Sequence, residues 1–291
     1  PNCPLGANYR STKKILEAAD QVISKNSSRR DKKLWTDNET GDDLNLFEAF
    51  NEREEAMYIV DQVQKYLRGS EAPQYKDFAV LYRTNAQSRV LEESFMRSGI
   101  PYRIIGGIKF YERKEIKDIL AYLRLIHNPA DNVAFARIIN VPTRGIGAKT
   151  LERLQLAATS HNVPIYTVAK QVSAYLPDLS TRARTQVLGF VNLISRLQQQ
   201  NLTERASALI RYLIESSGYK EYLLQQEGEV VSESRIENIQ ELVSVASKYD
   251  SLEPGVSLAV FLEEVALIAD TDSISDQENA VTLMTIHSSK G

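Results

Sequence analysis

The sequence predicts an α/β domain whose parallel sheet is interrupted by a large all-helical insertion. Apolar segments of strand and helix character alternate up to about residue 105. Helical periodicity then dominates to about residue 269, and strand character returns at residues 281–287. Strands separated by helices are typical of a parallel sheet, and the last strand is expected to rejoin it after the insertion.

The first elements are predicted to be a helix and then a strand. Ser11 is a candidate N-cap, because apolar residues recur at helical spacing from there to about Ser24. Leu44, Leu46 and Phe50, which polar residues separate, favour a short strand.

The remaining elements of the α/β part follow in order. Asn51, with Glu54 three residues later, forms a capping-box pattern and predicts the start of a helix. The apolar run at residues 78–82 is typical of a parallel strand buried on both faces. A helix is expected at residues 86–97 and a short strand at residues 102–105. In the last strand, Val281, Leu283, Thr285 and His287 should share one face, and the sheet should have about four strands.

The insertion shows four apolar helix faces, at residues 116–126, 209–214, 236–243 and 258–265. A polar linker is expected at residues 270–279. We therefore expect a leader at residues 1–7, the α/β domain at residues 8–105 and 278–291, and the helical domain at residues 106–277. A sheet of about four strands that stops where a strand-to-helix loop should begin indicates a fragment.

Composition excludes several classes of protein. With 43% hydrophobic and 25% charged residues, the chain is neither disordered nor fibrous. No apolar stretch is long enough to span a bilayer. One cysteine and three scattered histidines predict no internal disulfide and no metal site. A cytoplasmic protein is expected, and a net charge of −3 means that nucleic acid would have to bind at local patches.

The segment at residues 143–150 superficially resembles a phosphate-binding P-loop. Its spacing fails, because Ala148 separates Gly147 from Lys149. A tight Gly-Ile-Gly turn could instead present the backbone N–H groups of a helix N-terminus to a phosphate, with Arg144 and Lys149 beside it. The alternative is a helix–helix corner that binds nothing. The local sequence leaves both interpretations open.

Other candidates follow predicted strands or begin a helix. Arg83 and the pair Thr285 and His287 lie where parallel strands end, which is the edge at which open α/β sheets bind ligands. Arg83 could equally pair with a carboxylate. Tyr9 and Arg10 precede the first helix and could serve a nucleotide, the ring by stacking and the guanidinium by contacting phosphate, or could simply be a surface pair.

Seven segments taken together are more specific for one protein family than any one of them is alone. They are NYRST at residues 8–12, KLWT at 33–36, LYRTNAQSR at 81–89, GG at 106–107, FYERKEIKD at 110–118, PTRGIG at 142–147 and LMTIHSSKG at 283–291. In this order they resemble the UvrD/PcrA/Rep group of superfamily-one DNA helicases, over residues 8–291. The resemblance implies a partial RecA-like domain of the P-loop NTPase type, called 2A, which is interrupted by a helical domain called 2B.

The resemblance also implies roles for single residues at a nucleotide site. Tyr9 would stack on adenine, and Arg10 would contact the γ-phosphate as a catalytic arginine finger. Lys290 and Gly291 would belong to the same ATP site.

A second set of residues is implied to contact DNA. Arg83, Asn85, Thr285 and His287 would contact single-stranded DNA. The duplex would be held by a turn made of Thr143, Arg144, Gly145, Ile146, Gly147, Lys149 and Thr150.

The parent protein implied by the resemblance is an ATP-dependent helicase that moves 3′ to 5′ in repair or replication. It would use ATP and Mg²⁺ and bind single-stranded and duplex DNA, with repair proteins as partners of 2B and no membrane. The P-loop and the Mg²⁺-binding motif are absent from this sequence, so we expect the chain alone to bind no cofactor and to hydrolyse no ATP. The alternatives are a non-catalytic DNA-binding or partner-docking module, and a subunit of a helicase–nuclease.

Overall fold

The computed structural model describes residues 7–27, 34–69, 73–226, 228–272 and 278–290. Contacts divide the chain into two compact units, residues 1–55 and residues 56–291. The predicted fold class is confirmed, since the second unit combines a small parallel sheet with many helices. The domain boundaries at residues 105 and 277 stay a prediction.

The first unit contains α1 (Lys13–Ile23), the helix predicted there. Thr12, not Ser11, occupies the N-cap position, and its side chain makes no capping hydrogen bond. The strand predicted around Leu44 is wrong, because those residues form no regular element. Leu46 is 98% exposed and Phe50 94% exposed, so their alternation with polar residues marks no sheet face within this unit.

The next helix, α2 (Glu52–Leu67), begins at the predicted capping box. The Asn51 side-chain oxygen accepts hydrogen bonds from the N–H groups of Arg53 and Glu54, both at 3.0 Å. Glu54 reaches back to the N–H of Phe50 at 2.5 Å, one residue before the cap itself. The acidic first turn also complements the positive end of the helix dipole.

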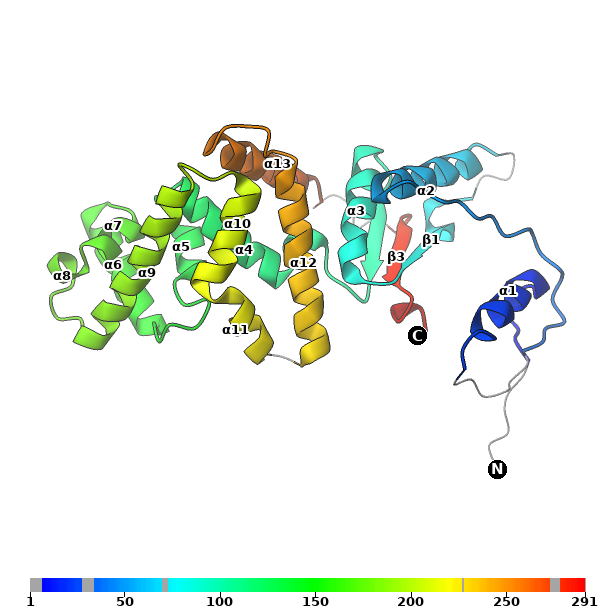
Figure 1. The fold of residues 1–291 in the computed structure, drawn as a ribbon, viewed down its shortest axis with the longest axis horizontal. Coiled ribbons are helices and arrows are strands. Elements are labelled where there is room, and N and C mark those ends of the chain that lie inside the picture. Colours follow the sequence, from blue (N-terminus) through cyan, green and yellow to red (C-terminus); the bar gives the residue numbers. More distant parts are fainter. Residues whose placement is uncertain (1–6, 28–33, 70–72, 227, 273–277, 291) are drawn as a thin grey trace, which may run out of the picture. The chain divides into compact units, whose positions relative to one another are not determined.

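The sheet has three parallel strands among the described residues: β1 (Ala79–Tyr82), β2 (Tyr102–Ile105) and β3 (Val281–Thr285). Their order is β1-β3-β2, so the last strand of the chain lies between the first two (Figure 1). Leu283 is opposite Val80 on one side and Ile104 on the other. The predicted return of the chain to the first sheet is confirmed.

Two details of the predicted strands are wrong. Leu81 is 51% exposed, because β1 lies at an edge of the described sheet and only part of its run faces the core. His287 is not a member of the strand face, since β3 ends at Thr285 and His287 lies in the turn after it. The predicted helix at residues 86–97 is confirmed by a 3₁₀ turn, η2 (Asn85–Gln87), followed by α3 (Ser88–Arg97).

The helical portion confirms the four predicted apolar faces, which belong to α4, α10, α12 and α13 (Figure 1). Residues 273–277 of the predicted linker lie outside the described residues, and α13 extends into its first part. The helices are α4 (Lys114–His127), α5 (Asn132–Ile138), α6 (Ala148–His161), α7 (Ile165–Lys170), α8 (Val172–Tyr175), α9 (Thr181–Gln200), α10 (Ala206–Ser217), α11 (Tyr219–Gln226), α12 (Glu229–Ser247) and α13 (Val256–Asp272).

Separate hydrophobic cores stabilise the sheet and the helical portion. The sheet core packs α2 and α3 against the strands around Phe95 and Tyr102. The helical core is larger and includes Phe135 and Phe190, whose rings meet edge to face with centroids 5.5 Å apart. Within the described residues, no helix combines the length and the apolar character that a bilayer crossing needs.

A buried polar network joins α3 to α12. Arg89 donates to Glu93 on its own helix and to Glu241 of α12, each at 2.6 Å. Burial opposes the charge on Arg89, but the two facing carboxylates outweigh it and raise its pKa. Arg113 donates to Asn238 of α12 at 2.7 Å and to Ser88 of α3 at 2.8 Å. These satisfied charges fix α12 against the helix that follows β1.

Candidate nucleic-acid and nucleotide sites

The carboxyl ends of β1 and β3 bring four predicted site residues to one edge of the sheet. Arg83 and Asn85 follow β1, while Thr285 ends β3 and His287 comes two residues later. A guanidinium nitrogen of Arg83 lies 3.2 Å from Nδ1 of His287, and both side chains are exposed. The edge therefore presents a guanidinium, an imidazole and polar groups to the solvent.

Among the described residues, Arg83 makes no ion pair with a carboxylate. Its loop is fixed through the backbone instead. The side-chain oxygen of Gln87 accepts from the N–H groups of Arg83 at 2.8 Å and Thr84 at 3.1 Å. Sequence reasoning missed this role of Gln87, although a Thr followed three residues later by Gln is a capping-box spacing.

The loop after β2 lies close to the loops that follow β1 and β3. Gly106 has a φ of +71°, and a Cβ built there would lie 2.5 Å from the Oγ of Ser288. A Cβ on Gly107 would lie 3.7 Å from the side-chain oxygen of Asn85. Ser288 also lies 3.0 Å from the hydroxyl of Thr285. The loops that follow all three strands thus meet at one place.

The Gly-Ile-Gly segment is the turn that leads into α6. Gly145 has a φ of +75°, and Gly147 is the N-cap residue, so no side chain caps the first N–H groups of the helix. Ile146 anchors the turn, since it is only 3% exposed. The exposed positions of residues 143–150 are Thr143, Gly145, Gly147, Ala148 and Lys149, and Thr150 is half-buried.

Arg144 is engaged inside this turn. One of its guanidinium nitrogens donates to the carbonyl oxygens of Ile138 at 3.1 Å, Ile139 at 3.3 Å and Pro142 at 3.1 Å. The other donates to the hydroxyl of Tyr122. These bonds hold the guanidinium against the helical core, a structural role that the sequence did not reveal.

The environment of Tyr122 is consistent with this role. Burial raises its pKa to about 12, although the nearby Arg144 charge opposes the shift. The hydroxyl donates to the carbonyl oxygen of Val141 at 2.5 Å while it accepts from Arg144. Lys149, by contrast, is exposed and makes no ion pair within the described part of the chain. It is the cation of the turn that can meet a ligand.

The nucleotide candidates of the first unit lie in a loop that is held by asparagines. Asn8 accepts from the N–H groups of Arg10 at 3.0 Å and Ser11 at 2.8 Å, and Asn38 donates to the carbonyl oxygen of Tyr9 at 3.2 Å. The Tyr9 ring is 86% exposed and Arg10 is also exposed. A fixed backbone thus presents an aromatic ring and a guanidinium outward, which suits a base and a phosphate.

The described residues do not include the parts of Lys290 and Gly291 that would contact a nucleotide. The backbone of Lys290 ends the 3₁₀ turn η4 (Ser288–Lys290), its side chain is outside the description, and Gly291 lies outside the described residues. Across the described ranges, no three His, Cys, Asp or Glu side chains gather as metal ligands.

Comparisons with known proteins find similar sequences over almost the whole chain. A family model described as the UvrD-like helicase C-terminal domain matches residues 3–291. Proteins named ATP-dependent DNA helicase PcrA from Staphylococcus epidermidis RP62A and Staphylococcus aureus Mu50 are each 44% identical to it over 289 residues. The match covers 99% of this chain but 39% of each relative, so the chain spans about two fifths of their length.

Proposed function

Since this chain belongs to the family of UvrD-like helicase C-terminal domains, we propose that it is the part of an ATP-dependent 3′–5′ DNA helicase that binds DNA. The observation that carries the proposal is the meeting of Arg83 and His287 at the carboxyl edge of the sheet, 3.2 Å apart and exposed. Both side chains are exposed, so the pair is available to a ligand.

At this edge we place single-stranded DNA. The guanidinium of Arg83 and the imidazole of His287 can donate to phosphate oxygens, and Asn85 and Thr285 add polar groups beside them. Such contacts grip the sugar–phosphate backbone without reading the bases, which suits a protein that must move along any sequence. Gln87 would orient Arg83 through its backbone bond.

Duplex DNA would bind at the turn before α6. The uncapped N–H groups at the start of a 14-residue helix, together with the helix dipole, favour an anionic phosphate. Gly145 and Gly147 lack side chains and let a backbone approach closely, while Lys149 adds a charge. The hydroxyls of Thr143 and Thr150 would complete the contact. Few phosphates are contacted, so weak and salt-sensitive binding is expected.

ATP would contact Tyr9 and Arg10, and the family resemblance also assigns Lys290 and Gly291 of the last motif to nucleotide binding. Bound ATP supplies the free energy for movement, and this chain contributes a stacking ring and a cation for the terminal phosphate. The family resemblance assigns the phosphates to a P-loop and Mg²⁺ to an acidic motif, and this sequence contains neither. The chain alone is therefore expected to show no ATPase activity.

The test uses the longer protein that contains this chain. Unwinding of a duplex with a 3′ tail is measured with ATP for the wild type and for Arg10→Ala. The proposal predicts that the variant loses unwinding and ATPase activity while it still binds the tailed DNA. Full unwinding by Arg10→Ala, or unwinding only of 5′-tailed duplexes, would contradict it.

A further inference from the structure

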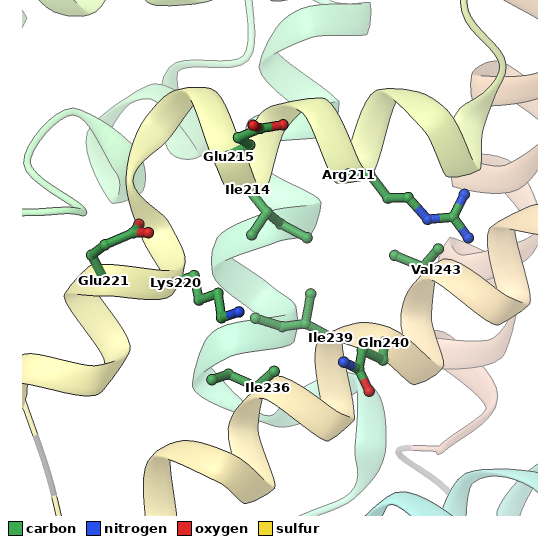
Figure 2. Close-up of a pocket in the computed structure, with 9 residues that line it drawn as sticks. All are labelled: Arg211, Ile214, Glu215, Lys220, Glu221, Ile236, Ile239, Gln240 and Val243. Carbon is green, nitrogen blue, oxygen red and sulfur yellow. The ribbon is translucent and has the colours of Figure 1, made fainter. Parts of the chain in front are cut away.

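A groove lies between α10, α11 and α12, which contribute none of the residues of the candidate DNA sites (Figure 2). It encloses about 380 Å³, a volume that suits one or two inserted side chains. Figure 2 shows Ile214 of α10 facing Ile239 of α12 across the groove. Ile236 and Val243 extend this aliphatic floor along α12.

The rim of the groove is charged. Arg211, Glu215, Lys220 and Glu221 are all exposed. Among the described residues none of these four makes an ion pair, and Arg211 has only a 3.4 Å contact with the hydroxyl of Ser207. Two cations and two carboxylates around an aliphatic floor give the groove no net charge. A rim without net charge gives no electrostatic attraction for a phosphate backbone, so this surface does not favour a nucleic acid.

We propose that this groove docks an amphipathic helix of a partner protein. Arg211 and Glu215 are four residues apart on α10 and therefore lie one turn apart on the same face. A helix that packs along α10 presents its own residues with the same spacing. The complementary segment thus carries a carboxylate and a cation four residues apart, with aliphatic residues between them for the floor. This inference does not depend on the helicase proposal.

The complementarity is tested with three fluorescein-labelled helical peptides that share leucine anchors. They differ only in the charged pair, which is Glu and Lys, two Glu, or two Lys. Binding to the wild-type chain is measured by fluorescence anisotropy. The mixed peptide should bind roughly fivefold more tightly than the other two, because each mismatch replaces an attraction at the rim by a repulsion.

Charge reversal in the protein then separates this site from any other. Arg211→Glu makes the α10 pair acidic and should shift the preference to the peptide with two Lys. Glu215→Lys should shift it to the peptide with two Glu. Arg196→Glu, at an exposed position of α9, is the matched control and should leave the order unchanged. All three substituted side chains are exposed, and far-UV circular dichroism verifies that each variant is folded.

Several results would overturn the proposal. They are the absence of binding by all three peptides, the same order of affinity in every variant, and equal binding by a peptide whose leucines are replaced by serine. Analytical sedimentation of the chain alone tests whether a second copy of the chain occupies the groove. A dimer that Arg211→Glu dissociates would make this groove a self-association surface instead of a partner site.

Discussion

The guanidinium of Arg144 donates a hydrogen bond to the hydroxyl of Tyr122 and lies 5.9 Å from the centroid of the same ring. It also lies 5.3 Å from the centroid of the Phe190 ring. One side chain thus ties the Gly-Ile-Gly turn to α4 and α9, which belong to the helical core. The arginine therefore shapes the turn at which we propose that duplex DNA binds.

Arg144→Ala should lower the free energy of unfolding by about 2–4 kcal/mol, because buried carbonyl acceptors lose their donor. Arg144→Lys should recover little of this, since one ammonium group cannot replace two guanidinium nitrogens in a fixed plane. Lys149→Ala is the matched control and should change stability by less than about 0.5 kcal/mol. Urea unfolding measures all three. Equal stability of Arg144→Ala and Lys149→Ala would contradict the structural role.

Stability should fall as the pH rises from about 10 toward 12. An unfolded tyrosine loses its proton near pH 10, whereas burial raises the pKa of Tyr122 to about 12 in the folded protein. The folded state then binds more protons than the unfolded state, so a rising pH favours unfolding. Tyr122→Phe should reduce the loss between pH 9 and 11 by about 1 kcal/mol. If Tyr122→Phe loses as much stability over this range as the wild type, the burial of this hydroxyl does not cause the loss.

Gly106→Ala should cost more stability than Gly99→Ala. Both glycines have a positive φ, +71° and +65°, so both substitutions strain the backbone by about 1 kcal/mol. Only at Gly106 does the new Cβ meet a neighbour, the Ser288 Oγ at 2.5 Å. Thermal unfolding of the two variants measures the difference. The double variant Gly106→Ala/Ser288→Gly should recover the part due to crowding, and a failure to recover any would show that the close approach is unimportant.

Arg89→Met should destabilise the second unit by about 3–5 kcal/mol, because it removes a buried partner of Glu93 and Glu241. Arg97→Met on the same helix is the control. Its side chain is 67% exposed and lies 3.5 Å from Glu264, so less than about 1 kcal/mol is expected. Chemical unfolding compares the two. If both variants lose the same stability, the network between α3 and α12 does not hold these elements together.

The sequence predicted those features that depend on local spacing. The long helices and the strand at residues 281–285 follow from apolar periodicity, and Asn51 caps α2 as its spacing with Glu54 indicated. The strand predicted around Leu46 is wrong, because the alternation of apolar and polar residues does not show whether a neighbouring strand exists. The packing of Arg144 could not be predicted, since its acceptors are brought together only by the fold. Residue types alone do not distinguish a phosphate contact from a structural role.

The contact between Arg83 and His287 could also be predicted only in part from the sequence. Each residue was predicted to lie at a carboxyl edge, because both follow strands of a parallel sheet. Their 3.2 Å contact depends on the strand order, in which β3 lies beside β1. The sequence indicated that the last strand returns to the sheet, but not which strands lie beside it.

Fluorescence anisotropy with labelled single-stranded DNA and with a blunt duplex tests the central claim, that two separate surfaces grip the two forms of DNA. Arg83→Ala should weaken binding of the single strand roughly tenfold with little effect on the duplex, and Lys149→Ala should do the reverse. Arg124→Gln, an exposed cation of α4, should change neither. If Arg83→Ala and Lys149→Ala weaken both DNAs equally, or weaken neither, the two-surface account is wrong.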